Sequence, residues 1–170
     1  MDSKNAKQAA QKQVRHDPLD ICEQIAEASD WPCNRVDEKT LSVEVPGKWC
    51  DLEISFVWDP ELAVLQFMCA YRLNTEQAKT SDLHSLIGLL NEWLLVGHFG
   101  FCQEGEGEII FQHSLLTRGT PGPTVEQIED LVEAGRDACN RCFPAFEFCI
   151  VGETPSDMVL RTLYGEVGTA

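Results

Sequence analysis

The chain has 170 residues, of which 44% are hydrophobic, so its length and composition suit one domain with its own core. Its formal net charge is −15, and because residues 1–16 contribute +3, the remainder carries −18. This large negative charge of residues 17–170, called the body of the chain below, argues against nucleic acid and anionic membrane surfaces as partners. No apolar run approaches the roughly 20 residues that span a bilayer, and the N-terminus lacks a signal peptide's apolar segment, so we expect a cytoplasmic protein.

Eight cysteines are many for a chain of this length. In a reducing compartment a free cysteine behaves as a small hydrophobic residue, so we expect mainly buried, structural thiols. The one CxxC motif joins Cys139 and Cys142 and has no second ligand pair, whereas zinc takes about four ligands. Residues three apart also share one side of a helix, so we predict neither a metal site nor redox chemistry there.

The N-terminal third begins with a polar segment. Residues 1–16 have no apolar stripe and predict a mobile basic tail. Asp17 and Pro18 then open a helix as its N-cap and first residue, and residues 29–32 end it, because the residue before a proline avoids the helical conformation. Alternation of apolar and polar residues predicts a strand over 41–45.

Residues 49–73 predict two antiparallel strands joined by a tight turn at Asp59-Pro60. Side chains of a strand alternate between its two faces, and the apolar positions of both halves fall on one face. A turn at that dipeptide places Phe56 opposite Ala63 and Cys50 opposite Cys69.

Leucines at helical spacing then predict a helix over residues 78–96, whose stretch from Leu83 to Leu94 we expect to form the main helical cover of the sheet. Two short strands follow at 98–103 and 108–115, joined by a glycine-rich turn.

The C-terminal third is predicted to be mostly helical. Thr124 caps a long helix that Pro144 kinks or ends, and residues 146–151 fit a helix or a strand equally well. A last short helix follows Thr154, and residues 164–170 form a tail. The predicted order is α-βββ-α-ββ-α, an α+β domain over residues 17–163 with a largely antiparallel sheet and its helices packed on one face.

No stretch of the sequence specifies a reaction. His98 and His113 flank the second predicted hairpin and point to opposite faces, so they do not converge. A cysteine–histidine nucleophile needs a third orienting group and an oxyanion site, and the sequence has a motif for neither. No glycine-rich phosphate loop is present. We therefore assign no catalytic, cofactor-binding or metal-binding residue.

The second strand of the 49–73 hairpin also has apolar side chains on the face opposite the core, at Leu62, Val64, Met68 and Ala70. If helices cover only one side of the sheet, this face is left for another chain, and these four residues are our candidates for a protein interface. We expect a homodimer through this face with Met68 near its own mate. Because the body charge near −18 opposes self-association, such a dimer should strengthen with salt.

Several short stretches occur together: Pro18-Leu19-Asp20, residues 45–51, Asn91-Glu92-Trp93, Gly97-His98-Phe99, residues 111–116 and residues 143–148. Together they resemble the YbjN-like family of bacterial proteins, which is labelled as sensory transduction regulators, over about residues 17–163. The resemblance implies a fold similar to that of type III secretion chaperones, which are small, acidic, cytoplasmic α+β proteins that commonly dimerise and hold a partner chain extended. Gln112 departs from the arginine expected there, which removes a charge that a partner site might have used. The resemblance supplies no catalytic residue.

Two functions therefore stay open. The first is a non-enzymatic protein-binding or chaperone-like regulatory protein in bacterial stress response or signalling, with a protein partner whose identity the sequence does not give. The alternative is a small thiol- or histidine-dependent enzyme that uses His98, His113 or a cysteine. An exposed Cys–His pair with strongly perturbed pKa values would favour the enzyme, and an exposed apolar patch or a large two-fold interface would favour the binding protein.

Overall fold

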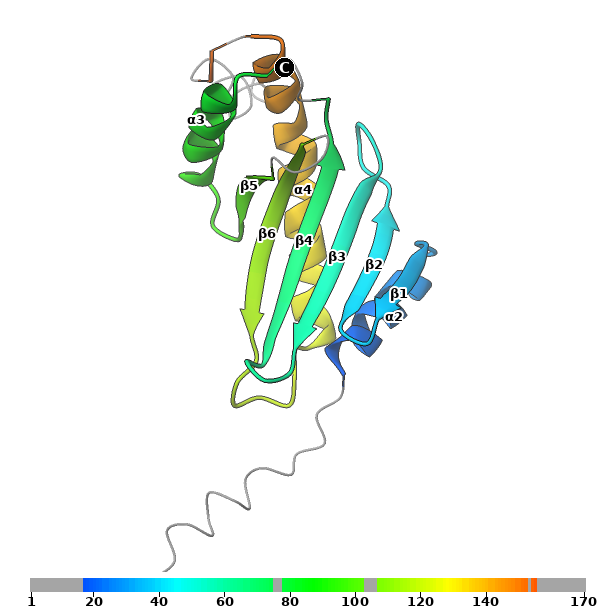
Figure 1. Ribbon diagram of the computed structural model, residues 1–170. Coiled ribbons are helices and arrows are strands. Elements are labelled where there is room, and N and C mark those ends of the chain that lie inside the picture. Colours follow the sequence, from blue (N-terminus) through cyan, green and yellow to red (C-terminus); the bar gives the residue numbers. More distant parts are fainter. Residues whose placement is uncertain (1–16, 75–77, 103–106, 153, 156–170) are drawn as a thin grey trace, which may run out of the picture.

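The computed structural model describes residues 17–74, 78–102, 107–152 and 154–155. Within them the chain forms three helices and six strands, shown in Figure 1. These elements are α2 (Pro18–Ala28), β1 (Cys33–Asp37), β2 (Thr40–Val45), β3 (Leu52–Asp59), β4 (Val64–Arg72), α3 (Thr80–Asn91), β5 (His98–Cys102), β6 (Glu108–Leu116) and α4 (Val125–Ile150). None of these helices is long and apolar enough to cross a membrane. The two predicted tails and the predicted helix after Thr154 lie outside the described residues.

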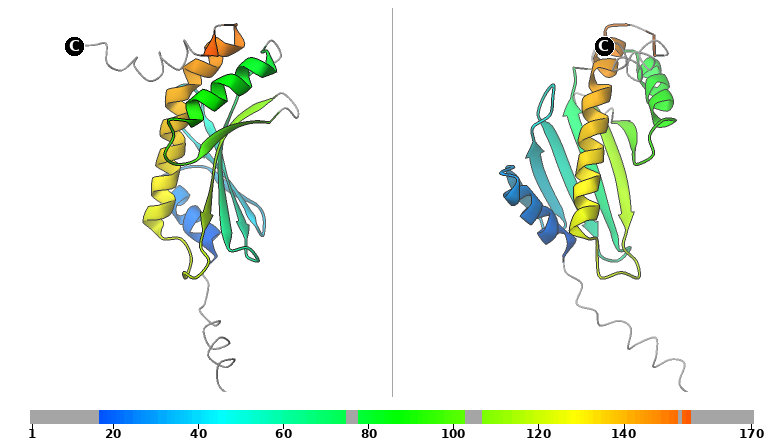
Figure 2. Two further views of the ribbon diagram at one scale, coloured as in Figure 1. Left: turned by 90° about the vertical axis from the view of Figure 1, so that its left-hand side faces the viewer. Right: turned by 180° about the vertical axis from the view of Figure 1, so that it is seen from behind.

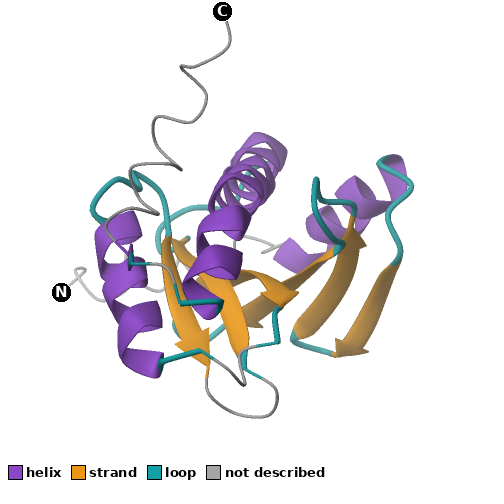
Figure 3. Cartoon of the chain, turned by 90° about the horizontal axis from the view of Figure 1, so that it is seen from above, coloured by secondary structure: helices purple, strands orange, loops and turns teal. Residues whose placement is uncertain are grey.

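The six strands form a single sheet in the order β1-β2-β3-β4-β6-β5, and every neighbouring pair is antiparallel. All three helices lie on one face of this sheet, as Figure 2 shows from the side and from behind and Figure 3 from above. The predicted two-layer α+β architecture, with helices on one face of an antiparallel sheet, is thereby confirmed. The core lies between the two layers, where one side of each helix meets the inward side chains of the strands.

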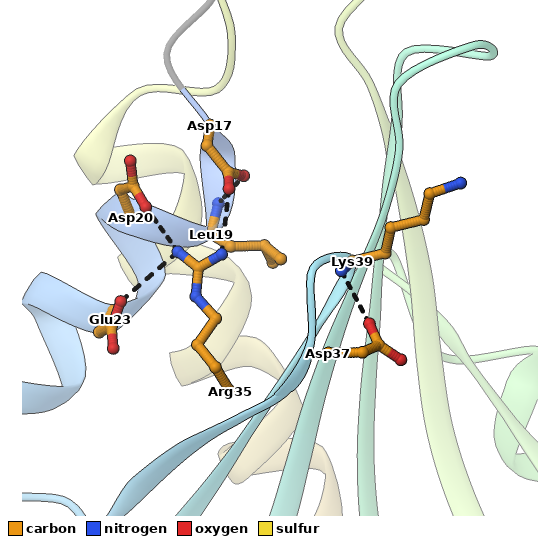
Figure 4. A network of polar contacts seen from close by, with 7 residues as sticks. All are labelled: Asp17, Leu19, Asp20, Glu23, Arg35, Asp37 and Lys39. Atoms are coloured by element: carbon orange, nitrogen blue, oxygen red, sulfur yellow. Dashed lines mark hydrogen bonds and ion pairs between the residues drawn. The ribbon is translucent and has the colours of Figure 1, made fainter.

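The element order differs from the prediction by one strand, because β1 precedes the three strands expected before α3. The sequence of β1, CNRVD, does not alternate between apolar and polar residues, and the strand lies at the edge of the sheet. A polar network holds it against α2 (Figure 4), in which Arg35 Nη1 lies 3.0 Å from Asp17 Oδ2 and Arg35 Nη2 contacts Asp20 and Glu23. These ion pairs are partly exposed, so each contributes little energy by itself, yet together they attach the edge strand to the helix layer.

The hairpin of β3 and β4 has the predicted faces but a longer turn. Phe56 pairs with Phe67 instead of the expected Ala63, so that part of the prediction was wrong. Asp59 Oδ1 accepts hydrogen bonds from the backbone N–H groups of Glu61 and Leu62 at 2.9 and 3.0 Å, and Ala63 adopts a φ of 55°. The aspartate therefore organises a four-residue loop, which shifts the register by an even number of residues and leaves the buried face unchanged.

The main helical cover of the sheet is α4, whereas we expected the helix around residues 83–94. Helix α4 runs along the sheet through 26 residues, and α3 lies at one end beside β5 (Figure 2). At Gly135 the helix comes so close to β4 that an added Cβ would lie 2.6 Å from Cε1 of Phe67. Pro144 does not end α4, and the residues after it continue the helix to Ile150.

Candidate protein-binding face

The sheet face that points away from the helices is called the open face here. None of the described helices covers it (Figures 2 and 3). By strand register its side chains come from Ser42 and Glu44 of β2, Glu53, Ser55 and Val57 of β3, Val64, Gln66, Met68 and Ala70 of β4, Ile110, Gln112 and Ser114 of β6, and His98 and Gly100 of β5. Val57, Val64, Met68, Ala70 and Ile110 are half-buried, whereas Leu116, which stands opposite Val64 at the end of β6, is 75% exposed.

Three of the four candidate interface residues lie together on this face. Val64, Met68 and Ala70 occupy alternate positions of β4, each half-buried. Leu62 does not join them, because it belongs to the β3–β4 turn, where its side chain is 67% exposed. The tight two-residue turn expected from the sequence would have kept Leu62 in the strand, and the longer loop organised by Asp59 removes it.

Two hollows lie along the open face, one bordered by Ala70 and the other by Met68. The first encloses about 470 Å³ and is bordered by residues of β2, β3, β4, β6 and the segment before β3, among them the acidic residues Glu44, Glu53 and Glu108. The second encloses about 260 Å³ and is bordered by Gln66, Met68, His98, Gln112 and Ser114 among others. Both are open to solvent, so an extended segment lying across the strands could fill both of them at once.

Two acidic residues lie side by side in the first hollow. Glu44 of β2 and Glu53 of β3 are directly opposite each other in the ladder and point to the same face. Glu108 of β6 also borders this hollow. The sequence analysis missed this pair, because it follows only from the register of β2 against β3.

The thiols do not form a nucleophilic site in the part of the chain that the structure describes. Five of the eight are buried, at Cys22, Cys69, Cys139, Cys142 and Cys149. Burial raises the pKa of the Cys22 and Cys142 thiols to about 12. Since the thiolate is the reactive form, such groups are inert near neutral pH.

The CxxC motif lies on the buried side of α4. There Cys139 Sγ is 3.6 Å from Cys69 Sγ, and this contact, together with burial, raises the pKa of the Cys139 thiol. The expected pairing of Cys50 with Cys69 was wrong, because Cys69 faces Ile54 in the ladder and Cys50 precedes β3. Both cysteines of the motif thus serve packing between helix and sheet.

The two histidines of β5 and β6 lie on opposite faces, as the alternation predicts. His98 is on the open face, where its Nε2 lies 3.0 Å from Nε2 of Gln112, and His113 stands in register with Phe67 on the helix side. Among the described residues no group of three or more His, Cys, Asp or Glu side chains is placed to hold a metal ion. The histidine geometry therefore offers no convergent base and nucleophile.

Comparison with solved structures supports the fold. One similar structure is the crystal structure described as "YbjN, a putative transcription regulator from E. coli", with 12% identity, a TM-score of 0.50 and coverage of 88% of this chain and 94% of that one. Another is the crystal structure of the ExsC–ExsE complex, with 15% identity, a TM-score of 0.56 and coverage of 72% and 88%. The expected fold-level similarity to type III secretion chaperones is confirmed.

Comparison of sequences gives two results. A search of curated proteins finds no significant match. The family described as "YbjN: Putative bacterial sensory transduction regulator" matches residues 18–148, which is most of the chain and includes every described strand and helix except the last two residues of α4. The chain therefore belongs to the YbjN family.

Proposed function

We propose that the chain is a non-enzymatic, protein-binding regulatory protein that holds an extended segment of a partner on its open face. One observation carries this proposal: a six-stranded sheet has all its described helices on one side, and the other side has half-buried apolar residues between two hollows. A segment laid across this face would cover Val57, Val64, Met68, Ala70 and Ile110 and remove their remaining apolar surface from water.

The comparisons support this role at the level of fold and family. ExsC was solved in a complex with ExsE, which provides a precedent for a protein of this fold that binds another protein. The family description points to regulation in bacteria, and we place the chain in the cytoplasm, in a stress-response or signalling pathway. We also propose that the chain acts as a homodimer.

The thiol- or histidine-dependent enzyme has less support. The buried thiols whose pKa values are raised to about 12 would be protonated near neutral pH, and His98 and His113 face opposite sides of the sheet. No observation on the described residues favours catalysis over binding.

Affinity capture with matched variants tests the proposal. The full chain, Met68→Glu and Val36→Glu would each be used to capture proteins from native lysate, followed by mass spectrometry. Met68 lies on the open face, and Val36 is a 60% exposed apolar residue of β1, so both substitutions add the same charge to the surface. Circular dichroism would show that each variant is folded.

We expect at least one specific partner to be retained by the full chain and by Val36→Glu and lost by Met68→Glu. Hydrogen exchange on the purified complex should then show slower exchange in β3, β4 and β6. A partner that Met68→Glu retains equally well would contradict the assignment of the open face.

A further inference from the structure

Two buried thiols are in contact between the helix layer and the sheet. Sγ of Cys139 in α4 lies 3.6 Å from Sγ of Cys69 in β4 and 3.7 Å from the carbonyl oxygen of Cys69. Both residues are 0% exposed. This pair is distinct from the CxxC motif of Cys139 and Cys142, whose two positions belong to the same helix, because it joins two elements at positions 70 residues apart in the chain.

The close approach of α4 to β4 makes this contact possible. Gly135 lies about one helical turn before Cys139, and an added Cβ at Gly135 would be 3.4 Å from Cβ of Cys69. A disulfide brings its two sulfur atoms to about 2.0 Å, so these two atoms would have to move together by about 1.6 Å. A movement of this size is within the range of rotation about the two Cα–Cβ bonds.

A polar atom without a partner lies in the same part of the core. Tyr71 of β4 is 2% exposed, and its hydroxyl has no hydrogen-bond partner among the described residues. Burial raises the pKa of this hydroxyl, and the nearby thiols of Cys139, Cys142, Cys50 and Cys69 raise it further. An unpaired buried hydroxyl is uncommon and needs an explanation. Here it is a donor that can stabilise negative charge on a neighbouring sulfur atom.

We propose that Cys69 and Cys139 form an oxidation site, at which hydrogen peroxide converts the two thiols into a disulfide that links β4 to α4. In the first step the sulfur of one thiol attacks the peroxide, the O–O bond breaks, and a sulfenic acid and one water molecule are formed. In the second step the other sulfur attacks the sulfenic sulfur, the S–O bond breaks, and a second water molecule leaves. The two thiols lose two electrons and two protons in all, and these reduce one hydrogen peroxide to two molecules of water.

The contact between the two sulfur atoms selects this pair. The hydrogen bond to Cys69 and burial raise the pKa of the Cys139 thiol, so little thiolate is present near neutral pH and the first step is slow. The second step is fast, because the partner sulfur is already in contact. Hydrogen peroxide is small and uncharged, and the first hollow, which Cys50 and Tyr71 also border, gives it a route toward this part of the core.

The disulfide would connect the main helical cover of the sheet to one of its central strands. Cys69 lies between Met68 and Ala70, which belong to the open face. A link between positions 70 residues apart restricts the unfolded chain, so the oxidised protein should need more urea to unfold than the reduced one. The inference does not depend on the proposed function, because it concerns thiols of the core whether or not the open face binds a partner.

Peptide mapping of the full chain tests the proposal. The reduced chain is incubated with hydrogen peroxide while folded, its remaining thiols are alkylated in denaturant, and it is digested with trypsin without reduction. Trypsin cleaves after lysine and arginine, so the disulfide would join peptides 49–72 and 137–141. The first of these peptides also contains Cys50, and Cys50→Ser is therefore the matched control for a link through that half-buried thiol.

We expect the linked peptides to be the main oxidised product of the full chain and of Cys50→Ser, with a loss of two of the eight thiols in the full chain. The link should be absent in Cys69→Ser, whose fold circular dichroism would verify. The urea midpoint of the full chain should rise on oxidation and return when dithiothreitol is added.

Three outcomes would contradict the inference. Oxidation confined to Cys33, Cys50 and Cys102, without the link, would overturn the site, and this result on the unmodified chain decides even if Cys69→Ser fails to fold. Loss of the link in Cys50→Ser would overturn the assignment to Cys69. An unchanged urea midpoint in fully linked protein would overturn the stabilising effect.

Discussion

The indole of Trp49 donates a hydrogen bond of 2.8 Å from Nε1 to the backbone carbonyl of Asn140 in α4. In an uninterrupted helix that carbonyl accepts from the residue four positions later, which here is Pro144 and has no N–H. Trp49 therefore replaces the missing helical donor, and its ring also stacks on Phe143 at 6.2 Å between centroids. The loop before β3 thus supplies a donor to a carbonyl inside α4 that has lost its helical partner.

Trp49→Phe should destabilise the fold by about 1 kcal/mol, because it keeps an aromatic ring and loses the donor. Urea unfolding followed by circular dichroism measures the change. In a Pro144→Ala background the helix regains its own N–H, so the same substitution should cost clearly less. Additive effects of the two substitutions would show that the indole does not act through this carbonyl.

Leu90→Ala should lower the free energy of unfolding by about 2–5 kcal/mol, because it removes a large side chain from a buried position of α3. Leu90 is 3% exposed, and Leu95, only five residues later, is fully exposed. Leu95→Ala is the matched control and should change stability by less than about 0.5 kcal/mol. Similar values for the two substitutions would mean that α3 presents a different side to the core.

Native protein should expose few thiols to a thiol reagent. Five cysteines are buried, and Cys33, Cys50 and Cys102 are half-buried. We expect no more than these three to react before unfolding, and all eight to react in denaturant. Alkylation followed by mass spectrometry identifies the order, and early labelling of Cys139 or Cys142 would contradict the packing described for α4.

Stability should fall as the pH rises above 9. The pKa values of Cys22 and Cys142 are raised by burial from 9.0 to about 12, so the unfolded chain releases these protons first. The contribution of each thiol is complete below pH 9 and is lost as the pH rises toward 12, with a slope of about 1.4 kcal/mol per pH unit. Urea unfolding at several pH values, in the presence of a reducing agent, measures this slope. Cys142→Ala should make the slope smaller by the contribution of that one thiol.

The dimer should become tighter as salt is added. A body charge of −18 on each copy opposes association, and this repulsion is screened over about 10 Å at 0.1 M ionic strength. Light scattering at low and high salt measures the change. A dimer that weakens with salt would instead indicate attractive ion pairs at its interface.

The sequence predicted the buried faces well because alternation and helical spacing report burial directly. It did not predict β1, whose polar residues carry no such pattern and whose position depends on Arg35 reaching α2. It also misjudged the β3–β4 turn. The carbonyl of Ala63, a residue with positive φ, accepts hydrogen bonds from the backbone and the hydroxyl of Thr117 at 2.9 and 3.0 Å. Thr117 is 54 residues away, so no local pattern reports this contact.

The same distinction applies to the candidate face. Val64, Met68 and Ala70 could be assigned to one face from their spacing alone, because parity survives an even shift in register. The hollows and the Glu44–Glu53 pair depend on three or more strands being in register, and a single sequence does not give that alignment.

The irregular register and the ion pairs at β1 bear on whether further chains could join the sheet. A sheet that could accept a strand at both edges would add copies without limit and grow into a fibre. Here Arg35 and the irregular register block one edge, and at the other edge the side chain of Asn91 occupies the backbone N–H and carbonyl of Phe99, so both edges of the described sheet resist the addition of a strand.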